Sequence, residues 1–198
     1  MTRLFFTLLT FALTSVSMWG GVVLTMDEVS QQTVNGLTVS KNGYDFTFSS
    51  QVDAQYNFGG PPQALYLNGP AIVGQPNQDE VLEIVFGSPL DNFQFGFTLT
   101  FFGDVADAIT VARYDERGNK VGEEKANAQK SLVFAEGLYK YKGAAVNSIK
   151  ITFASPDTSQ DPLNGFAIDN FAVDIPEPAT VALAGAALAL LALRRKSA

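Results

Sequence analysis

Apolar and polar residues alternate with a period of two through the middle of the chain. Residues 90–101 carry five large apolar side chains at alternate positions, namely Phe93, Phe95, Phe97, Leu99 and Phe101. A strand places such residues on one face, whereas a helix would scatter them around its axis. The same alternation occurs in the segments 44–48, 82–86, 109–111 and 149–153. The pattern predicts strands that each bury one face, with the phenylalanine face of 90–101 in the core.

Short clusters of turn-forming residues separate these segments. They combine Gly with Asn or Pro at 35–36, 41–43, 59–62, 68–70, 117–119 and 164–165. Many short strands with frequent turns and no βαβ rhythm predict an all-β domain of two packed antiparallel sheets over residues 27–175. Only residues 123–130 are compatible with a helix, and they have no apolar stripe. We therefore expect a polar connection or a short solvent-facing helical turn there.

The pattern alone does not decide between an immunoglobulin-type sandwich and a jelly roll. Antibody-type domains carry a buried Trp and paired Cys. This chain has no Cys, and its one Trp, Trp19, lies near the N-terminus. We therefore expect a jelly roll, flanked by an N-terminal signal helix and a C-terminal hydrophobic helix.

The N-terminal residues break the alternation. Arg3 precedes an almost wholly apolar or hydroxylated run at 4–16, and Ser15 and Ser17 place small residues at positions −3 and −1 of a cleavage after Ser17. This order is typical of a secretory signal peptide at 1–17, with cleavage around Gly20-Gly21 as an alternative. A first buried strand or helix is the competing interpretation. A signal peptide predicts an exported domain.

The C-terminal residues 176–198 have three parts in a fixed order. Pro176-Glu177-Pro178 comes first, an uncharged apolar run follows at 181–193, and Arg194-Arg195-Lys196 closes it. The prolines stop a strand or helix from continuing out of the preceding domain. As a helix, the apolar run covers ~20 Å, short of the ~30 Å hydrocarbon core. An ordinary tail anchor and a buried core helix are the alternatives to a processed segment.

These residues resemble the PEP-CTERM sorting signal of Gram-negative bacteria. In that family, a membrane-embedded exosortase recognises the signal, and the proteins usually accompany exopolysaccharide and biofilm-matrix systems. The resemblance implies an exosortase as partner, a membrane-anchored precursor in the cell envelope, and a final place at the cell surface or in the extracellular matrix. It assigns Pro176, Glu177, Pro178, Arg194 and Arg195 to the sorting motif. The segments 114–121 and 166–171 also resemble β-rich domains that are commonly fused to such tails.

Composition excludes several classes of function. The chain contains no Cys and no His, so disulfide frameworks, His-assisted hydrolase triads and common zinc sites are excluded. Residues 27–175 hold nineteen Asp or Glu and nine Lys or Arg, a net charge of about −10. Such a surface repels nucleic acid, which is bound through clusters of Lys and Arg.

Catalysis has little support in the sequence. Carboxylates occur close together at 79–83, at Asp104 and Asp107, and at Glu123 and Glu124. Glycoside hydrolysis needs two carboxylates facing one cleft, and such clusters arise easily on the solvated loops of an acidic chain. The chain shows no nucleophile elbow, phosphate loop or metal-ligand spacing. We therefore expect a protein that is not an enzyme.

A structural calcium site is one candidate function of the domain. Asp169 and Asn170 interrupt an otherwise apolar final strand, and Ca²⁺ takes oxygen ligands from carboxylates, amides and carbonyls. Asp27 or Glu28 could supply an opposing carboxylate. In the alternative interpretation Asp169 accepts backbone amides at a bulge or points to solvent.

A carbohydrate site is the other candidate. Tyr56, Phe58 and Tyr66 stand among amides and glycines, and aromatic rings can stack on sugars while amides bind hydroxyl groups. Alternatively, these rings cover the end of the sandwich core. The leading hypothesis is thus a non-catalytic exported protein associated with exopolysaccharide, and the alternative is a calcium-dependent carbohydrate-binding module.

Overall fold

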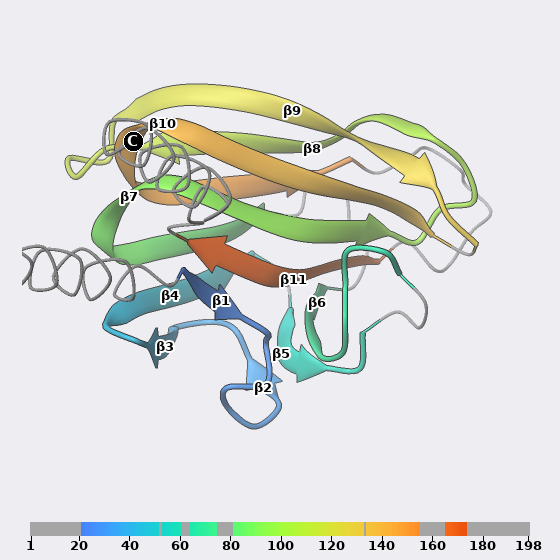
Figure 1. The fold of residues 1–198 in the computed structure, drawn as a ribbon, viewed down its shortest axis with the longest axis horizontal. Coiled ribbons are helices and arrows are strands. Elements are labelled where there is room, and N and C mark those ends of the chain that lie inside the picture. Colours follow the sequence, from blue (N-terminus) through green and yellow to red (C-terminus); the bar gives the residue numbers. More distant parts are fainter. Residues whose placement is uncertain are drawn as a thin grey trace, which may run out of the picture. The chain divides into compact units, whose positions relative to one another are not determined.

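The computed structural model describes residues 21–51, 53–60, 64–74, 81–132, 134–154 and 165–173 (Figure 1). Val22–Val173 forms a compact unit by itself. The strands of this unit run from Val22 to Val173. The signal helix and the hydrophobic helix predicted at the two ends lie outside the described residues. Within the described ranges, no helix is long and apolar enough to cross a membrane.

The described part of the chain forms strands joined by turns and loops. In chain order the strands are β1 (Val22–Leu24), β2 (Gln32–Thr33), β3 (Leu37–Lys41), β4 (Tyr44–Ser50), β5 (Gln55–Phe58), β6 (Ala71–Gly74), β7 (Val81–Leu99), β8 (Val105–Tyr114), β9 (Lys120–Lys130), β10 (Ala135–Phe153) and β11 (Phe166–Val173). Their pairings are all antiparallel. The predicted all-β antiparallel sandwich is confirmed.

Two long strands, β7 and β10, run through both layers of the sandwich. Their pairing shifts register between Lys142 and Ser148, where both strands bend. The first layer has the order β3-β4-β7-β10-β8-β9 and uses the N-terminal half of β7. The second has the order β2-β5-β6-β11-β7-β10 and uses the C-terminal half of β7. The continuous sheet therefore folds back on itself.

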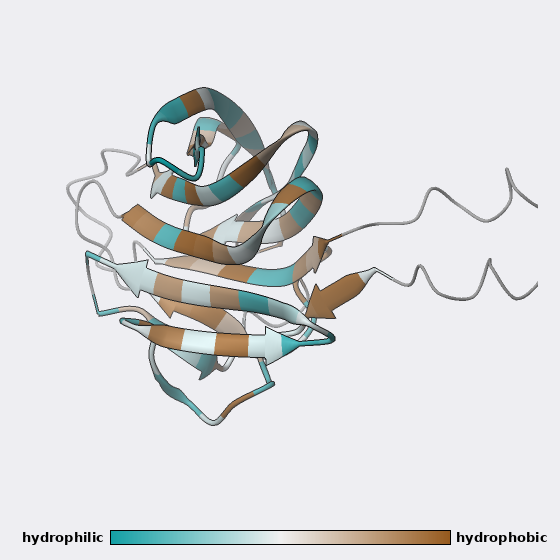
Figure 2. Cartoon of the chain, turned by 90° about the vertical axis from the view of Figure 1, so that its left-hand side faces the viewer, coloured by the Kyte–Doolittle hydropathy of each residue, from teal (hydrophilic) through white to brown (hydrophobic). Residues whose placement is uncertain are grey.

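Aromatic side chains fill the space between the layers. Phe93, Phe95 and Phe97 are fully buried, as the alternation predicts, and Figure 2 shows hydrophobic and hydrophilic bands alternating along the strands. Phe171 of β11 stacks on Phe93 and Phe95, with ring centroids 5.6 and 5.8 Å apart. Its ring also meets Phe46 of the opposite layer at 5.6 Å. Phe171 is thus a central element of the core.

The prediction of a polar connection or helical turn at 123–130 is wrong, because these residues belong to strand β9. The strand pairs with β8 from Lys120 to Ala128. Its inward positions are occupied by small residues, with Ala128 buried and Ala126 partly buried against the core. The strand does alternate, but alanines occupy its inward positions. A pattern of large apolar residues therefore does not reveal it.

Candidate functional site

A loop crosses the outer face of the second layer, and we call its described residues 64–70 the strap. Three side chains from the sheet hold the strap. The backbone N–H of Leu65 donates to Glu136 of β10 at 2.6 Å, and that of Asn68 donates to Asp169 of β11 at 2.8 Å. Asn170 donates its side-chain amide to the carbonyl of Tyr66 at 2.9 Å. Charged acceptors make such bonds stronger than neutral ones.

The sheet beneath the strap is built for close approach. Gly96 of β7 is paired with Asp169, and a Cβ at Gly96 would stand 2.3 Å from the carbonyl oxygen of Tyr66. Only a residue without a side chain lets the strap lie this close to the sheet. Leu67 of the strap, Ala71 and Ala167 form a small apolar cluster there, separate from the main core.

Asp169 and Asn170 act together at a β-bulge. The pairing of β11 with β7 shifts register between Asp169 and Ala172, and Asn170 adopts a left-handed φ of 55°. Asn is one of the few residues that tolerate this conformation. The Asp169 carboxylate is fully buried and accepts the N–H of Asn170 at 2.6 Å as well as that of Asn68. Burial raises its pKa, which the two amide bonds lower only in part.

A second carboxylate, the partly buried Glu28, follows β1. It accepts hydrogen bonds from Lys41 at 2.6 Å, from the hydroxyl of Tyr56 at 2.6 Å and from the backbone of Thr25 at 2.9 Å. Burial favours a higher pKa for Glu28, but these donors outweigh it and lower the pKa to about 2. The same contact and burial raise the pKa of Tyr56. Asp27 and Glu28 lie near enough to Asp169 to raise its pKa electrostatically.

The predicted ligand Asp169 is therefore close to the predicted opposing carboxylates, but the carboxylate oxygens of Asp169 and Glu28 already have protein partners. Both oxygens of Asp169 accept backbone amides, and Glu28 is paired with Lys41. Among the described residues, no three acidic side chains are grouped so that they could hold a metal ion. In this structure Asp169 accepts backbone amides, which is the alternative interpretation given for it from the sequence.

The three predicted carbohydrate-binding aromatics lie in two different environments. Tyr56 is fully buried and packs on Phe48, so its ring has no exposed face for a sugar. Phe58 is 43% exposed and is the cross-strand partner of Ala71. Tyr66 packs against the small cluster that contains Ala71. The structure therefore brings Phe58 and Tyr66 to the same outer side and places Tyr56 in the core.

A bulge in β5 explains why Tyr56 and Phe58 separate. The register of β5 against β6 shifts between Gln55 and Phe58, and Asn57 has a φ of 56°. One extra residue reverses the side on which the next side chain points. Asn57 also donates its side-chain amide to the carbonyl of Val29 at 2.6 Å. Alternation read from the sequence cannot detect such a bulge.

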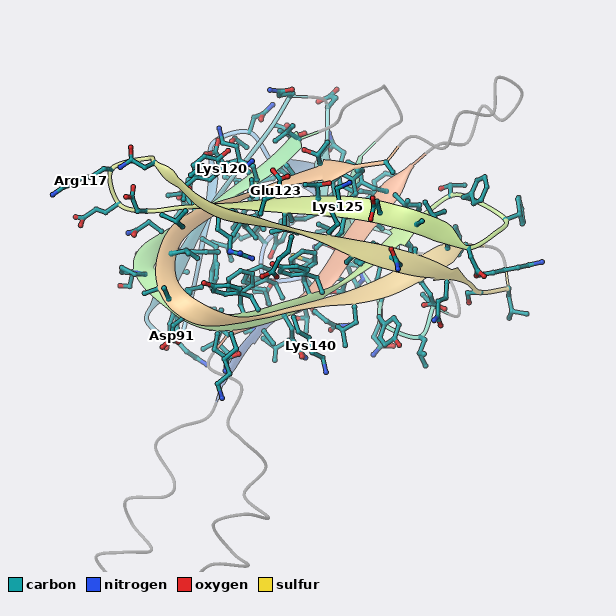
Figure 3. The ribbon with its side chains drawn as sticks, turned by 90° about the horizontal axis from the view of Figure 1, so that it is seen from above. Asp91, Arg117, Lys120, Glu123, Lys125 and Lys140 are labelled. Atoms are coloured by element: carbon teal, nitrogen blue, oxygen red, sulfur yellow. The ribbon has the colours of Figure 1, made fainter. Side chains whose placement is uncertain are left out.

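Most of the neighbouring carboxylates that could suggest catalysis are engaged elsewhere. Four of them form ion pairs, namely Glu123 with Lys120, Asp107 with Lys125, Glu124 with Arg113, and Glu83 with Lys150. Figure 3 shows Lys120, Glu123 and Lys125 along β9, with Arg117 at the tip of the β8–β9 hairpin. Asp104 accepts the backbone N–H of Lys130 at 2.7 Å. The contacts of Glu123, Asp107, Glu124 and Asp104 all involve the edge strand β9, whereas the pair of Glu83 and Lys150 joins β7 to β10. These carboxylates thus make contacts within the sheet.

A family model for the PEP-CTERM protein-sorting motif matches residues 174–196. The match begins directly after Val173, the last residue of β11. It confirms the predicted sorting signal on a chain whose folded part is β-rich. The motif indicates an exported protein of the cell envelope. No curated protein matches the chain.

Comparison with solved structures gives distant similarities. A variant of a family 29 carbohydrate-binding module with mannohexaose has 12% identity and a TM-score of 0.42, covering 78% of this chain and 90% of that chain. Another variant of that module, with cellulohexaose, has 13% identity and a TM-score of 0.38, covering 73% and 89%. The lectin domain of lectinolysin with Lewis B antigen has 12% identity and a TM-score of 0.33, covering 51% and 70%. Similarities with such low identities and TM-scores do not assign a ligand to this chain.

Proposed function

We infer that the chain is a non-catalytic protein that an exosortase processes at the cell envelope and delivers to the cell surface or the extracellular matrix. The observation that carries this proposal is the position of the sorting motif. The motif occupies 174–196, whereas the compact unit ends at Val173. Cleavage near Pro176-Glu177-Pro178 therefore leaves every strand of the domain in place.

The residues beyond the prolines suit a temporary anchor. The apolar run at 181–193 is short for a lasting span, and Arg194 and Arg195 would be retained on the cytoplasmic side, where positive residues accumulate. The membrane is thus a partner of the precursor. Exopolysaccharide is the proposed partner of the processed protein, and the acidic domain excludes nucleic acid from this role.

The motif itself is tested by changing Pro176, Glu177 and Pro178 to Ala in the native host. We expect the variant to stay full length and membrane-bound. Glu116→Ala with Arg117→Ala, two exposed positions in the β8–β9 turn, serves as the matched control and should be processed normally. Normal processing of the motif variant would refute the assignment.

A carbohydrate site on the outer side of the second layer is the second candidate function. Its support is that Phe58 and Tyr66 lie beside the same residue, Ala71, and that Asn68, two positions after Tyr66, is exposed on the strap. Exposed rings can stack on sugars, and an amide can bind their hydroxyl groups. Affinity electrophoresis in gels that contain exopolysaccharide from the native host tests this proposal.

Calcium binding through Asp169 and Asn170 stays a prediction for the same region. A cation there would have to draw on oxygens that now accept backbone amides from Asn68 and Asn170. Thermal melting with and without Ca²⁺ decides it, because a ligand that binds only the folded state raises the melting temperature.

A further inference from the structure

Arg113, near the end of β8, reaches from the first layer to the second and is only 9% exposed. Its Nη1 donates to the hydroxyl of Tyr139 on β10 at 3.1 Å and pairs with Oε1 of Glu124 on β9 at 3.0 Å. The Tyr139 hydroxyl donates in turn to Oε2 of Glu124 at 3.1 Å. The guanidinium carbon also lies 4.5 Å from the ring centre of Tyr141. These contacts hold the guanidinium group in one orientation.

The contacts use only one side of the guanidinium group. It has five N–H donors, and the two on Nη1 are taken by Tyr139 and Glu124. Within the described part of the chain, Nε and Nη2 of Arg113 have no hydrogen-bond acceptor. Because every fully buried side-chain nitrogen and oxygen of these residues has a partner, Nε and Nη2 must reach the surface. Arg113 therefore keeps a free edge of two parallel donors, the arrangement that binds two neighbouring oxygen atoms at once.

Gly122 on β9 keeps this free edge open. It is the cross-strand partner of Arg113, and a Cβ at this position would lie 2.5 Å from Nη2 and 3.3 Å from Nε. Any larger residue at 122 would therefore meet the donors that the protein leaves unused. Strand β9 is the outer strand of the first layer (Figure 1), and it pairs with β10 at Gln129 and Lys130, well along the strand from Gly122. The free edge is thus reached past an edge strand.

The charges beside the free edge favour a neutral ligand. The Glu124 side chain is 49% exposed there and already balances the charge of Arg113. Burial raises the pKa of Tyr139 to about 12, so its hydroxyl stays protonated. A ligand carboxylate or phosphate would be repelled by Glu124 and by the domain's net charge of about −10. Two neighbouring hydroxyl groups of a sugar fit better, because they accept from Nε and Nη2 and donate to the carboxylate of Glu124.

We propose that the free edge of Arg113, together with Glu124, binds two neighbouring hydroxyl groups of a neutral sugar unit in the exopolysaccharide. This inference rests on the proposed association with exopolysaccharide. The site is separate from Phe58 and Tyr66, which lie on the outer side of the second layer. It holds the sugar through hydroxyl groups and not through ring stacking, because the guanidinium group already covers the ring of Tyr141.

Two substitutions test the site. Arg113→Lys keeps a positive charge for Glu124 but removes the parallel donors. Gly122→Ala keeps Arg113 and places a methyl group against Nη2. We expect each to weaken binding to the exopolysaccharide in affinity electrophoresis about tenfold, the loss expected for hydrogen bonds to a charged group. Val121→Ala, at a neighbouring 54% exposed position, is the control and should bind like the wild type. Melting curves of each variant establish that it is folded.

The side-chain Nε–H of Arg113 reports on the site directly by NMR. Its signal is assigned by its absence from Arg113→Lys, and the Nε–H of Arg117, in the exposed β8–β9 turn, is an internal control. We expect the exopolysaccharide to shift the Arg113 signal and to leave that of Arg117 in place. Periodate cleaves the bond between carbons that carry neighbouring hydroxyl groups. Polymer oxidised with periodate should therefore leave the Arg113 signal unmoved.

The outcomes separate this site from the function on which it rests. If the wild type binds the exopolysaccharide, both variants bind equally well and the Arg113 signal does not move, then water alone occupies the free edge and the site is refuted. An equal shift of that signal by millimolar acetate or inorganic phosphate would show an anion site and overturn the neutral ligand. Absence of any binding by the wild type would overturn the association with exopolysaccharide, and this site with it. Weakened binding in Arg113→Lys and Gly122→Ala beside an unchanged Val121→Ala supports the proposal.

Discussion

The backbone N–H of Asn68 donates a 2.8 Å hydrogen bond to Oδ2 of Asp169, joining residues 101 positions apart in the sequence. This contact fastens the strap to the last strand, at the bulge where Asn170 makes its own bond to Tyr66. One buried carboxylate thus couples the outer loop to the strand from which the sorting motif emerges.

Removing that carboxylate should loosen the strap. We expect Asp169→Ala to lower the free energy of unfolding by about 2–4 kcal/mol, because it removes two hydrogen bonds to a charged acceptor. Asp169→Asn keeps one acceptor oxygen and should lose less. Denaturant unfolding of the three proteins measures this order, and equal stability of wild type and Asp169→Ala would refute the anchoring role.

The same variants test calcium. If Asp169 is a calcium ligand, millimolar Ca²⁺ raises the melting temperature of the wild type above its value in chelator, and Asp169→Ala abolishes the rise. Identical wild-type melting curves in Ca²⁺ and in chelator would leave Asp169 as an anchor for backbone amides only.

Glu28 should give the domain an acid-sensitive component of stability. Its pKa falls from 4.5 to about 2 on folding, so the folded state favours the charged form. The stabilisation is present above the unfolded pKa of 4.5 and is lost as pH falls towards 2. At about 1.36 kcal/mol per unit, it amounts to roughly 3 kcal/mol at most. Glu28→Gln should lack this pH-dependent component, and parallel stability curves of both proteins between pH 5 and pH 2 would contradict the assignment.

Asp169 acts with the opposite sign. Because its folded pKa is raised, the titration of Asp169 stabilises the domain most below its unfolded pKa and loses that contribution as pH rises through the folded value. Lowering the pH therefore removes stability through the titration of Glu28 and adds stability through that of Asp169. The Glu28 and Asp169 variants have to be measured separately for this reason.

The core prediction concerns the aromatic face of β7. Phe95 is fully buried, with its ring centroid 5.2 Å from that of Tyr139 and 5.8 Å from that of Phe171. Phe95→Ala should cost about 3–5 kcal/mol, a large share of the stability of an ordinary domain. Phe102→Ala, at a 60% exposed position, is the control and should change little. An unchanged melting temperature in Phe95→Ala would show that this face does not form the core.

Local alternation was enough to predict the main strands, because Phe93 to Leu99 repeat with the period of a strand. It could not predict the strap, since the acceptor Glu136 and the donor Leu65 are 71 residues apart and a backbone N–H has no sequence signature. The sequence also could not predict that Tyr56 and Phe58 point to opposite sides of the sheet, because the bulge at Asn57 depends on the pairing of β5 with β6. Asp169 was singled out correctly as a charge in an apolar strand, but its partner Asn68 was not identified as such.

The carbohydrate proposal predicts a difference between two exposed phenylalanines. Phe58→Ala and Tyr66→Ala should each weaken retardation in gels that contain exopolysaccharide, by about 1–2 kcal/mol of binding free energy if each ring stacks on a sugar. Phe102→Ala removes a more exposed ring elsewhere and should leave retardation unchanged. Equal retardation of all four proteins, wild type included, would remove this site from consideration.

Intact-mass measurement of the wild-type protein from its native host tests the sorting function most directly. The position of the motif after Val173 predicts that the envelope and secreted fractions contain a protein shortened by about 20 residues at its C-terminus, with strands β1 to β11 intact. The basic cluster at Arg194 and Arg195 should be absent from that mass. A mature protein that still carries residues 194–198 would show that the tail is a plain membrane anchor, and it would contradict processing at the PEP motif.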